Sequence, residues 1–453
     1  MAFEASREKM AAAGVSPLAI EVFARYAQQV ADGATGLIPE ETIEPITEVD
    51  SAVEFAQTVS QEAAREALSR TVMLKLNGGL GTSMGLDRAK SLIPVRDGKS
   101  FLDIICDQVR AAREKYGVRL PLIFMNSFRT QADTLEALPN DIAVGDLPID
   151  FLQGKEPKLL VDSLEPVEWP SDPSLEWCPP GHGDIFTTLT DMGLVDTLIE
   201  QGYKYMMTSN ADNLGATPSA EIAAWFAQSG APYAPEVCVR TAADRKGGHL
   251  ARRISDGRVI LRDTAQTPEH QMDYFTDEHR HPFFHTNNLW FNLEALSKLL
   301  HETNGLVGLP LIRNRKHVDP TDKTSPEVYQ LECAMGAIVA SFDGAQPVLV
   351  PRSRFLPVKT TNDLLTLRSD AYEVTPEAHL ELVVPAAPVI DLDKEYFQFV
   401  DDFDERFPSV PSLKDVTTFT VKGDWHFTEG VAFSGDVALA GNGSVTAHKV
   451  SES

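Results

Sequence analysis

The sequence predicts an α/β protein in which helices cover a parallel sheet, between a helical N-terminal region and a small C-terminal β region. Strand-like apolar runs alternate with helical patterns from residue 71 to residue 153, the βαβ order of a parallel sheet. Glycines follow the first of these strands, at 78–85, where α/β sheets carry their ligands. Short strands separated by glycine turns fill the end of the chain. We therefore expect regions at 1–70, 71–385 and 386–453.

The N-terminal region is expected to be helical. Apolar residues and alanines recur at helical spacing in AIEVFARYAQQV and AVEFAQTVSQEAAREAL. The proline-containing stretch GLIPEETIEPITEVD connects them. In the next region we expect strands in TVMLKLN, LPLIFMN and PIDFLQ, with helices in FLDIICDQVRAAREKYG and RTQADTLEAL between them. A further helix is expected in EVYQLECAMGAIVASF.

The glycine-rich loop after the first strand is a candidate phosphate-binding site. Open backbone at Gly78, Gly79 and Gly81 exposes N–H groups that suit phosphate oxygens, and Lys90 follows closely enough to add a charge. The loop is not a P-loop, because no Gly-Lys-Ser/Thr follows at the required spacing. It is not a dinucleotide fingerprint either, because the third glycine, Gly85, comes one place late. An ordinary strand-turn-helix connection is the alternative.

The stretch LNGGLGTSMGLDRAK resembles the L-x-G-G-x-G-T-x-M-G-x-x-x-x-K signature of eukaryotic-type UDP-sugar pyrophosphorylases, above all the UDP-glucose pyrophosphorylase family. The resemblance implies a Rossmann-like nucleotidyltransferase fold of GT-A type with a mixed sheet. It also implies that the loop and Lys90 bind a nucleotide triphosphate. The residues carried over to this role are Leu76, Asn77, Gly78, Gly79, Gly81 and Thr82. Ala89 stands where the family usually has proline before the lysine.

Three later motifs resemble the nucleotide site of the same family. FLQGKEPKL implies that Gln153 reads the uracil, since an amide both donates and accepts hydrogen bonds. PPGHGD implies a nucleotide contact for Gly181 and a catalytic, phosphate-contacting role for His182, close to the start of a helix. NADNLGA implies nucleotide contacts for Asn210 and Asp212, and Mg²⁺ on Asp212. Without the resemblance, ordinary interpretations would be favoured: a solvated loop residue for Gln153, a packed or exposed ring for His182 and a structural turn for Asp212.

The sugar-binding residues are implied by three further segments, the third of which contains Asp263. RKGGHL matches a family segment where the backbone approaches the sugar, at Gly248. HPFFHTNNLW resembles F-N-T-N-N-L-W, whose asparagines contact the hexose, and Asn287 and Asn288 are retained. His285 replaces the first asparagine, and Asp263 stands where the family has glutamate. Both departures lie where the sugar would bind, so the residues support the nucleotide chemistry better than the identity of the sugar.

The segment PRSRFLPVKTTNDLL nearly repeats a family motif, and it implies a catalytic, phosphate-binding role for Lys359. A capping Thr360 and Asp363 follow it, which predicts a rigid turn before a helix. Beyond residue 385, turns spaced every six to twelve residues suggest the stacked coils of a small β-helix, with a β-meander as the alternative. In relatives this region serves assembly or regulation, so self-association is possible.

Composition excludes several classes of protein. The formal net charge of -26 makes nucleic acid and anionic membrane poor partners. No apolar run approaches the length of a membrane span, and the charged N-terminus is unlike a signal peptide, so we expect a cytoplasmic protein. The four cysteines lack metal or redox spacing, which predicts buried free thiols.

Together these motifs predict a Mg²⁺-dependent uridylyltransferase that joins UTP and glucose 1-phosphate into UDP-glucose and pyrophosphate. The sugar phosphate is already anionic, so positioning and charge neutralisation are the main tasks of the protein. One alternative is the same transfer to galactose 1-phosphate or N-acetylglucosamine 1-phosphate. Another is a nucleotide-sensing protein without catalysis, which the presence of Lys90, Asp212 and Lys359 disfavours.

Overall fold

The structure is a computed structural model that describes residues 3–241, 244 and 247–446. The chain forms two compact units, and each is built from separate stretches of sequence. The first unit contains residues 1–76, 150–209 and 219–351, and the second contains 77–149, 210–218 and 352–453. The predicted regions were continuous, whereas the chain passes repeatedly between the two units.

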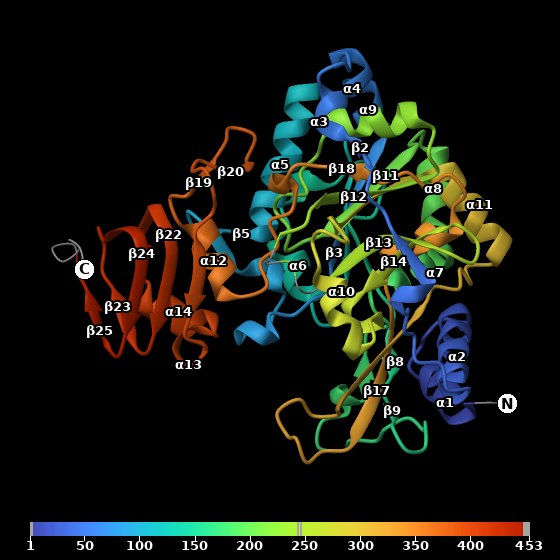
Figure 1. The fold of residues 1–453 in the computed structure, drawn as a ribbon. Helices are drawn as coiled ribbons and strands as arrows, with labels where there is room; N and C mark the ends of the chain where they lie inside the picture. The colour runs from blue at the N-terminus through green and yellow to red at the C-terminus, as the bar shows by residue number, and fades with distance from the viewer. Residues whose placement is uncertain (1–2, 242–243, 245–246, 447–453) are drawn as a thin grey trace. The chain divides into compact units, whose positions relative to one another are not determined.

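The first unit carries most of a mixed sheet (Figure 1). Six neighbouring strands lie in the order β2-β18-β12-β15-β11-β3. Strand β18 pairs in parallel with β2 and β12, whereas β15 is antiparallel to β12 and β11. These strands are β2 (Asp50–Ser51), β18 (Val348–Leu349), β12 (Tyr233–Val239), β15 (Phe283–Asn292), β11 (Tyr205–Asn210) and β3 (Thr71–Asn77). The predicted mixed sheet is confirmed.

Strand β3 is buried almost throughout, as its apolar sequence requires. Its one charged residue, Lys75, is fully buried and donates from Nζ to Ser209 Oγ on β11 at 2.8 Å. A buried ammonium needs such a partner, because desolvation without a hydrogen bond is costly. The strand therefore ends at a fixed place, which determines where the glycine loop begins.

Helices cover this unit, and several of them begin at recognisable caps. Ser16 caps α2 by accepting from Ala19 N at 3.1 Å, and Pro17 occupies the first turn. Helices α4 and α9 pack side by side (Figure 1). The N-terminal region is helical as expected, with short strands added. The helices are α1 (Glu4–Ala12), α2 (Pro17–Ala31), α3 (Ala52–Ala56), α4 (Gln61–Ser69), α7 (Ile185–Met192), α8 (Leu194–Glu200), α9 (Ala220–Ser229), α10 (Met272–Thr276) and α11 (Leu293–Thr303).

Smaller sheets complete the first unit. Strand β13 pairs with β1 and β14, and β17 pairs with β16 and β9. The predicted helix at 327–342 is wrong, because its first half is the strand β17 and its second half a 3₁₀ segment, Met335–Ser341. The strands of these smaller sheets are β1 (Ile43–Pro45), β8 (Glu156–Pro157), β9 (Leu159–Leu160), β10 (Trp177–Cys178), β13 (Gly248–Arg253), β14 (Val259–Asp263), β16 (Leu311–His317) and β17 (Glu327–Cys333). Strand β7 (Asp150–Leu152) of this unit belongs to the large mixed sheet.

The second unit begins at the glycine loop and contains the buried strand β6 (Leu122–Asn126) with helices α5 (Phe101–Tyr116) and α6 (Gln131–Ala137). Ser100 and Asp103 form a capping box at the start of α5, and Gly117 ends the helix in the left-handed conformation. The remaining elements are β4 (Pro94–Arg96), β5 (Lys99–Ser100), α12 (Thr361–Arg368), β19 (Tyr372–Val374), β20 (Leu380–Leu382), α13 (Lys394–Phe397) and α14 (Val400–Arg406).

The C-terminal strands of this unit run in parallel (Figure 1, red). Strand β22 (Ser412–Lys422) lies between β21 (Val389–Leu392) and β24 (Ala432–Ala440), and β23 (Trp425–Phe427) pairs with β25 (Gly443–Val445). Aromatic rings fill their interior, with Phe407 and Phe427 stacked 4.4 Å apart.

Candidate active site

The glycine loop in the second unit has the open backbone that the sequence predicts. Lys90 N donates to Gly79 O at 3.2 Å and Leu86 N to Gly81 O at 3.0 Å, which folds the loop on itself. Gly85 has φ +81°, and a Cβ there would lie within 3 Å of the ring of Phe399. Within the described part of the chain, the N–H groups of Gly79, Thr82 and Ser83 donate to no other residue. They are free to bind an anion.

Lys90 and Asp212 meet beside this loop. The Lys90 ammonium lies 2.7 Å from Asp212 Oδ2, and it also donates to the carbonyl of Val358. Val358 N donates in turn to Asp212 O at 3.2 Å. Segments far apart in the sequence therefore converge on one partly buried ion pair, and Lys359 is the next residue. This brings three of the sequence-predicted residues together.

The turn at Lys359 is followed by a capped helix, as predicted. Thr360 and Asp363 form the capping box of α12, and Asp363 Oδ2 accepts from the backbone N–H of Lys359 at 2.8 Å. The side chain of Lys359 is exposed and makes no hydrogen bond or ion pair with any residue that the structure describes. Its ammonium is therefore available to a phosphate.

The segment after Asn210 is fastened by a residue that the sequence reasoning passed over. The amide of Asn213 is buried and accepts from Gly215 N at 3.1 Å and from Leu356 N at 2.8 Å. It also donates to Arg354 O at 3.1 Å. Asn213 thus ties the strand end that carries Asp212 to the segment that leads to Lys359. The run NADN contained this signal, but nothing showed which polar residue would point inward.

The first unit contains the residues predicted to bind uracil and sugar. Gln153 is half-buried, and the next residue, Gly154, donates its N–H to Asp184 Oδ2 at 2.5 Å. Thr188 Oγ1 donates to the same oxygen at 3.3 Å. Burial raises the pKa of the Asp184 carboxyl to about 6. Asp184 links the Gln153 segment to the start of α7, where His182 lies.

His182 is held in one orientation by the backbone of the 3₁₀ segment that follows β17. Met335 N donates to its Nδ1 at 2.9 Å, so the ring proton lies on Nε2. Gly181, at φ +79°, allows the turn to approach Cys333, whose carbonyl would lie 2.6 Å from a Cβ at that position. Burial lowers the pKa of His182 to about 4. The ring can therefore offer phosphate a hydrogen bond rather than a charge.

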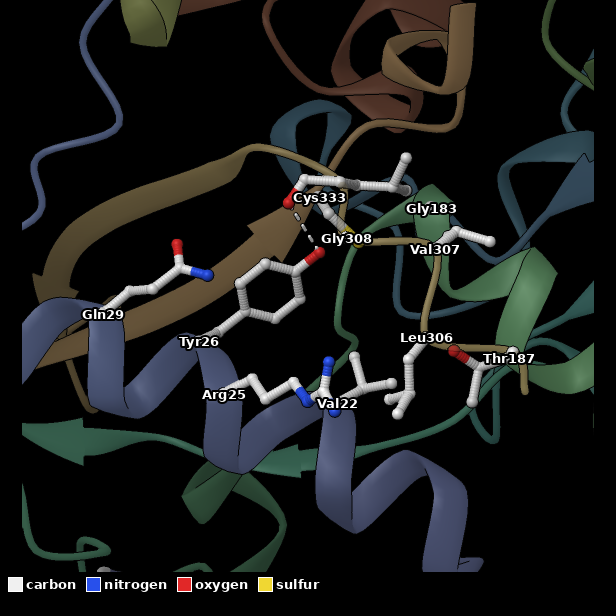
Figure 2. Close-up of a pocket in the computed structure, with 12 residues that line it drawn as sticks. Val22, Arg25, Tyr26, Gln29, Gly183, Thr187, Leu306, Val307, Gly308 and Cys333 are labelled. Atoms are coloured by element: carbon white, nitrogen blue, oxygen red, sulfur yellow. Dashed lines mark hydrogen bonds between the residues drawn. The ribbon is translucent and has the colours of Figure 1, made fainter. Parts of the chain in front are cut away.

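Helix α2 closes the far side of the His182 turn. The hydroxyl of Tyr26 donates to Leu309 O at 3.0 Å, and a cavity of about 120 Å³ lies between the helix, Gly183 and the 305–309 loop (Figure 2). Tyr26, Arg25 and Val22 point from the helix into it. The N-terminal region therefore supports the segment that positions His182.

His285 and the two asparagines after it face different surroundings on β15. His285 is buried, its Nδ1 accepts from Asn287 N at 3.3 Å, and burial beside His182 lowers its pKa to about 3. Asn288 is fully buried, and its amide donates to Glu236 Oε2 at 2.9 Å. Asn287 is half-buried and has φ +61°. Of the two asparagines, Asn287 is the one placed to contact a ligand.

The remaining sugar candidates face each other across one hairpin. Gly248 on β13 pairs with Asp263 on β14, and a Cβ at Gly248 would lie 2.7 Å from the Leu261 side chain. Asp263 caps the following 3₁₀ turn by accepting from Ala265 N at 3.1 Å. A buried network holds this hairpin: Glu40 accepts from Arg262 at 2.5 Å and from His281 at 3.1 Å. Sequence reasoning missed Glu40, which nothing in its local pattern distinguishes.

Comparison with known proteins identifies the class to which this fold and these residues belong. The sequence model of the family described as UTP--glucose-1-phosphate uridylyltransferase matches residues 20–434. A probable UTP--glucose-1-phosphate uridylyltransferase of Schizosaccharomyces pombe is 36% identical over 425 residues, which is 92% of this chain and 82% of that protein. The UTP--glucose-1-phosphate uridylyltransferase of Musa acuminata is 39% identical over 389 residues, 85% of this chain and 81% of that protein.

A solved structure agrees with these relatives. A mutant of UDP-glucose pyrophosphorylase from Leishmania major, crystallised in complex with UDP-glucose, is 40% identical and superposes with a TM-score of 0.88, covering 98% of both chains. The chain therefore belongs to the UTP--glucose-1-phosphate uridylyltransferase family.

Proposed function

We propose that the protein catalyses the reversible transfer of a uridylyl group from UTP to glucose 1-phosphate. The observation that carries this proposal is the convergence of Lys90, Asp212 and the Lys359 turn beside a loop with free N–H groups. The family relatives, and the UDP-glucose bound to the Leishmania enzyme, support the same function.

In the proposed reaction, an oxygen of the sugar phosphate attacks the α-phosphorus of UTP, and the bond from that phosphorus to the β-phosphate oxygen breaks. UDP-glucose and pyrophosphate are the products, so atoms and charge balance without an added oxidant or base. The attacking oxygen is already anionic. The chain therefore has to position two anions and offset their repulsion.

The residues divide this work. The free N–H groups of the loop and the ammonium of Lys90 would hold the triphosphate. Lys359, which has no partner among the described residues, would neutralise phosphate charge that grows in the transition state. His182 would donate one hydrogen bond from Nε2, because Nδ1 is occupied by Met335 N. Gln153 would read the imide edge of uracil.

Mg²⁺ is proposed as the cofactor, with Asp212 as its protein ligand. The residues fit this ion: one carboxylate lies beside the loop, and magnesium is usually held by one or two carboxylates together with substrate phosphates and water. No cluster of three or more His, Cys, Asp or Glu side chains in the described ranges could hold a metal by itself. When bound, the ion would offset triphosphate charge.

For the sugar, glucose is the proposed specificity, because the relatives are named for glucose 1-phosphate. Gly248, Asp263, His285 and Asn287 are the proposed determinants. Galactose 1-phosphate and N-acetylglucosamine 1-phosphate are disfavoured alternatives. They are included in the test because His285 and Asp263 depart from the family pattern.

The C-terminal strands are proposed to form a small β-helix through which copies of the chain associate. Successive parallel strands and an asparagine at the turn, where Asp424 N donates to Asn442 Oδ1 at 2.9 Å, support stacked coils. Light scattering after size exclusion tests the association, and a monomer at all concentrations up to about 100 µM would contradict it.

No helix in the described ranges is long and apolar enough to cross a membrane.

The decisive experiment is an assay of pyrophosphate release with UTP, Mg²⁺ and a panel of sugar 1-phosphates. Release with glucose 1-phosphate at a kcat/KM at least tenfold above the other sugars is expected. Equal or greater efficiency with another hexose 1-phosphate would reassign the sugar. No release with any of them would refute the enzymatic function.

A further inference from the structure

Helix α6 and its N-cap residue Thr130 contact both ends of the glycine loop. At the start of the loop, Thr134 Oγ1 accepts from Asn77 Nδ2 at 2.9 Å, and Thr130 Oγ1 donates to Asn77 O at 2.7 Å. At its end, Asp133 Oδ2 accepts from Ala89 N at 3.2 Å. One short helix thus fixes two points that lie twelve residues apart in the sequence.

The contacts at the start of the loop lie in a dry environment. Asn77 is 3% exposed, and Thr130 and Thr134 are fully buried. Asn126 at the end of β6 accepts a second hydrogen bond from Asn77 Nδ2 at 2.9 Å. Hydrogen bonds that are satisfied in such surroundings fix geometry, because any alternative arrangement leaves a buried polar group without a partner. The last residue of β3 therefore has one available orientation.

The contact at the end of the loop acts on Lys90. Ala89 immediately precedes Lys90, and Lys90 N donates to Gly79 O, so the two sides of the loop are joined at this point. A carboxylate that holds Ala89 N also fixes where the Lys90 side chain leaves the backbone. Asp133 is half-buried and touches no part of the loop that we assign to phosphate.

We propose that helix α6 sets the conformation in which the glycine loop binds the phosphates of UTP, with Asp133 and Thr134 as positioning residues. This inference rests on the proposed function of the loop and assigns a role to residues outside every motif of the sequence. Neither side chain is proposed to contact the substrate. Their effect should reach UTP through the loop and leave the sugar phosphate unaffected.

The test compares three variants of the full-length enzyme in steady-state kinetics. Asp133→Ala removes the acceptor, and we expect KM for UTP to rise about tenfold, the size of one typical hydrogen bond, with KM for glucose 1-phosphate changed less than twofold. Asp133→Asn keeps an oxygen that can accept from Ala89 N and should restore KM for UTP to within about threefold. Glu136→Ala, exposed on the same helix, is the matched control and should behave as wild type.

Amide hydrogen exchange without substrate gives a readout that does not depend on catalysis. Peptides covering 78–89 should exchange at least threefold faster in Asp133→Ala than in Glu136→Ala, and Thr134→Val should have the same effect if Asp133→Ala does not fold. Equal changes in both KM values, unchanged exchange, or no rescue by Asp133→Asn would overturn the proposal. A wild-type protein that releases no pyrophosphate would refute the proposed function, while the exchange result would still test the helix.

Discussion

Lys90 and Lys359 have similar roles in the proposed mechanism, but their surroundings differ. Lys90 is paired with Asp212 at 2.7 Å, whereas Lys359 is exposed. An ammonium that already has a carboxylate partner contributes less to the net charge that a phosphate meets. Lys359 is therefore the larger source of uncompensated positive charge among the candidate residues of the second unit.

Replacing Lys359 by alanine should lower kcat by at least about tenfold, because one charge directed at a developing phosphate charge supplies several kcal/mol. Steady-state kinetics at saturating UTP checks this. Lys394→Ala is the control, since Lys394 is an exposed lysine of the same unit. A kcat for Lys359→Ala within threefold of wild type would exclude the assigned role.

Asp184 gives a pH dependence of stability whose sign follows from its pKa of about 6, above the ordinary 3.8. The protonated carboxyl is the form that suits burial, so the stabilisation is complete below about pH 4 and is lost as pH rises through about 6. Relative to wild type, Asp184→Asn should become more stable by about 2.4 kcal/mol between pH 4 and pH 7.

Urea unfolding of both proteins across this pH range measures the difference. Asp273→Asn is the control, because Asp273 is exposed on helix α10 of the same unit and should show no such trend. A constant difference between Asp184→Asn and wild type would show that the carboxyl is already ionised at pH 4.

At the level of residues, the sequence predicted the candidate catalytic side chains well, and it predicted the residues that position them poorly. Lys90, Asp212 and the Lys359 turn come together as expected because each belongs to a motif with its own turn chemistry. Asn213, Asp133 and Asp184 were missed, since a polar residue that binds backbone inside the fold has no local signature. Their roles depend on partners tens to hundreds of residues away.

Strand β15 carries a structural residue and a candidate binding residue side by side. Side chains along the strand point alternately to its two faces. Asn288 lies on the inward face and donates to Glu236, which also accepts a hydrogen bond from Trp290 Nε1 at 2.9 Å. Asn287, one residue earlier, is half-buried in the left-handed conformation. Adjacent, chemically identical side chains should thus respond differently to substitution.

Asn288→Ala should destabilise the protein by about 2 kcal/mol, because it removes a donor from a buried carboxylate. Asn287→Gly keeps the backbone conformation and should leave the melting temperature within about 2 °C, a surface-like change, while KM for glucose 1-phosphate rises. Thermal unfolding of both variants checks the expected stabilities, and steady-state kinetics checks the expected rise in KM. If Asn287→Gly binds glucose 1-phosphate normally, the sugar assignment of Asn287 fails.

The element that the sequence predicted wrongly is also instructive. Residues 327–342 carry apolar side chains at spacings that fit a helix, but β17 forms because it pairs along its whole length with β16. Strand β16 is rich in charged residues, LIRNRKH, so its own pattern gave no hint of a partner. Tertiary pairing overrode a local pattern here, whereas the buried, strongly apolar β3 and β6 were predicted correctly.

For the whole molecule, the candidate residues fall into two groups. The glycine loop, Lys90, Asp212 and Lys359 belong to the second unit, and Gln153, His182 and the sugar candidates belong to the first. The composition, with a net charge of -26, gave no sign of this division. A phosphate in the site is affected more by nearby lysines and backbone donors than by the overall negative charge, because surface charges are screened beyond about 8 Å at physiological ionic strength.

Binding of UTP should raise the stability of the whole protein. At a concentration of 100 times Kd, a ligand that binds only the folded state adds about 2.7 kcal/mol, which a thermal shift assay detects. Chelating Mg²⁺ with EDTA should reduce the shift, and Lys90→Ala should nearly abolish it. An undiminished shift in EDTA would argue against a role for Mg²⁺ on Asp212 in UTP binding.

The alternation of the chain between its two units also constrains how it is made. The first unit has all its residues once residue 351 has been synthesised, whereas the second, begun at residue 77, needs residues 352–453. On the ribosome, residues 77–149, with the amphipathic α5 and the apolar β6, are therefore synthesised well before residues 352–453 complete their unit, whereas the first unit can already fold. A premature stop codon after residue 351 would leave this buried surface without its partners, and the product should depend on chaperones or be degraded.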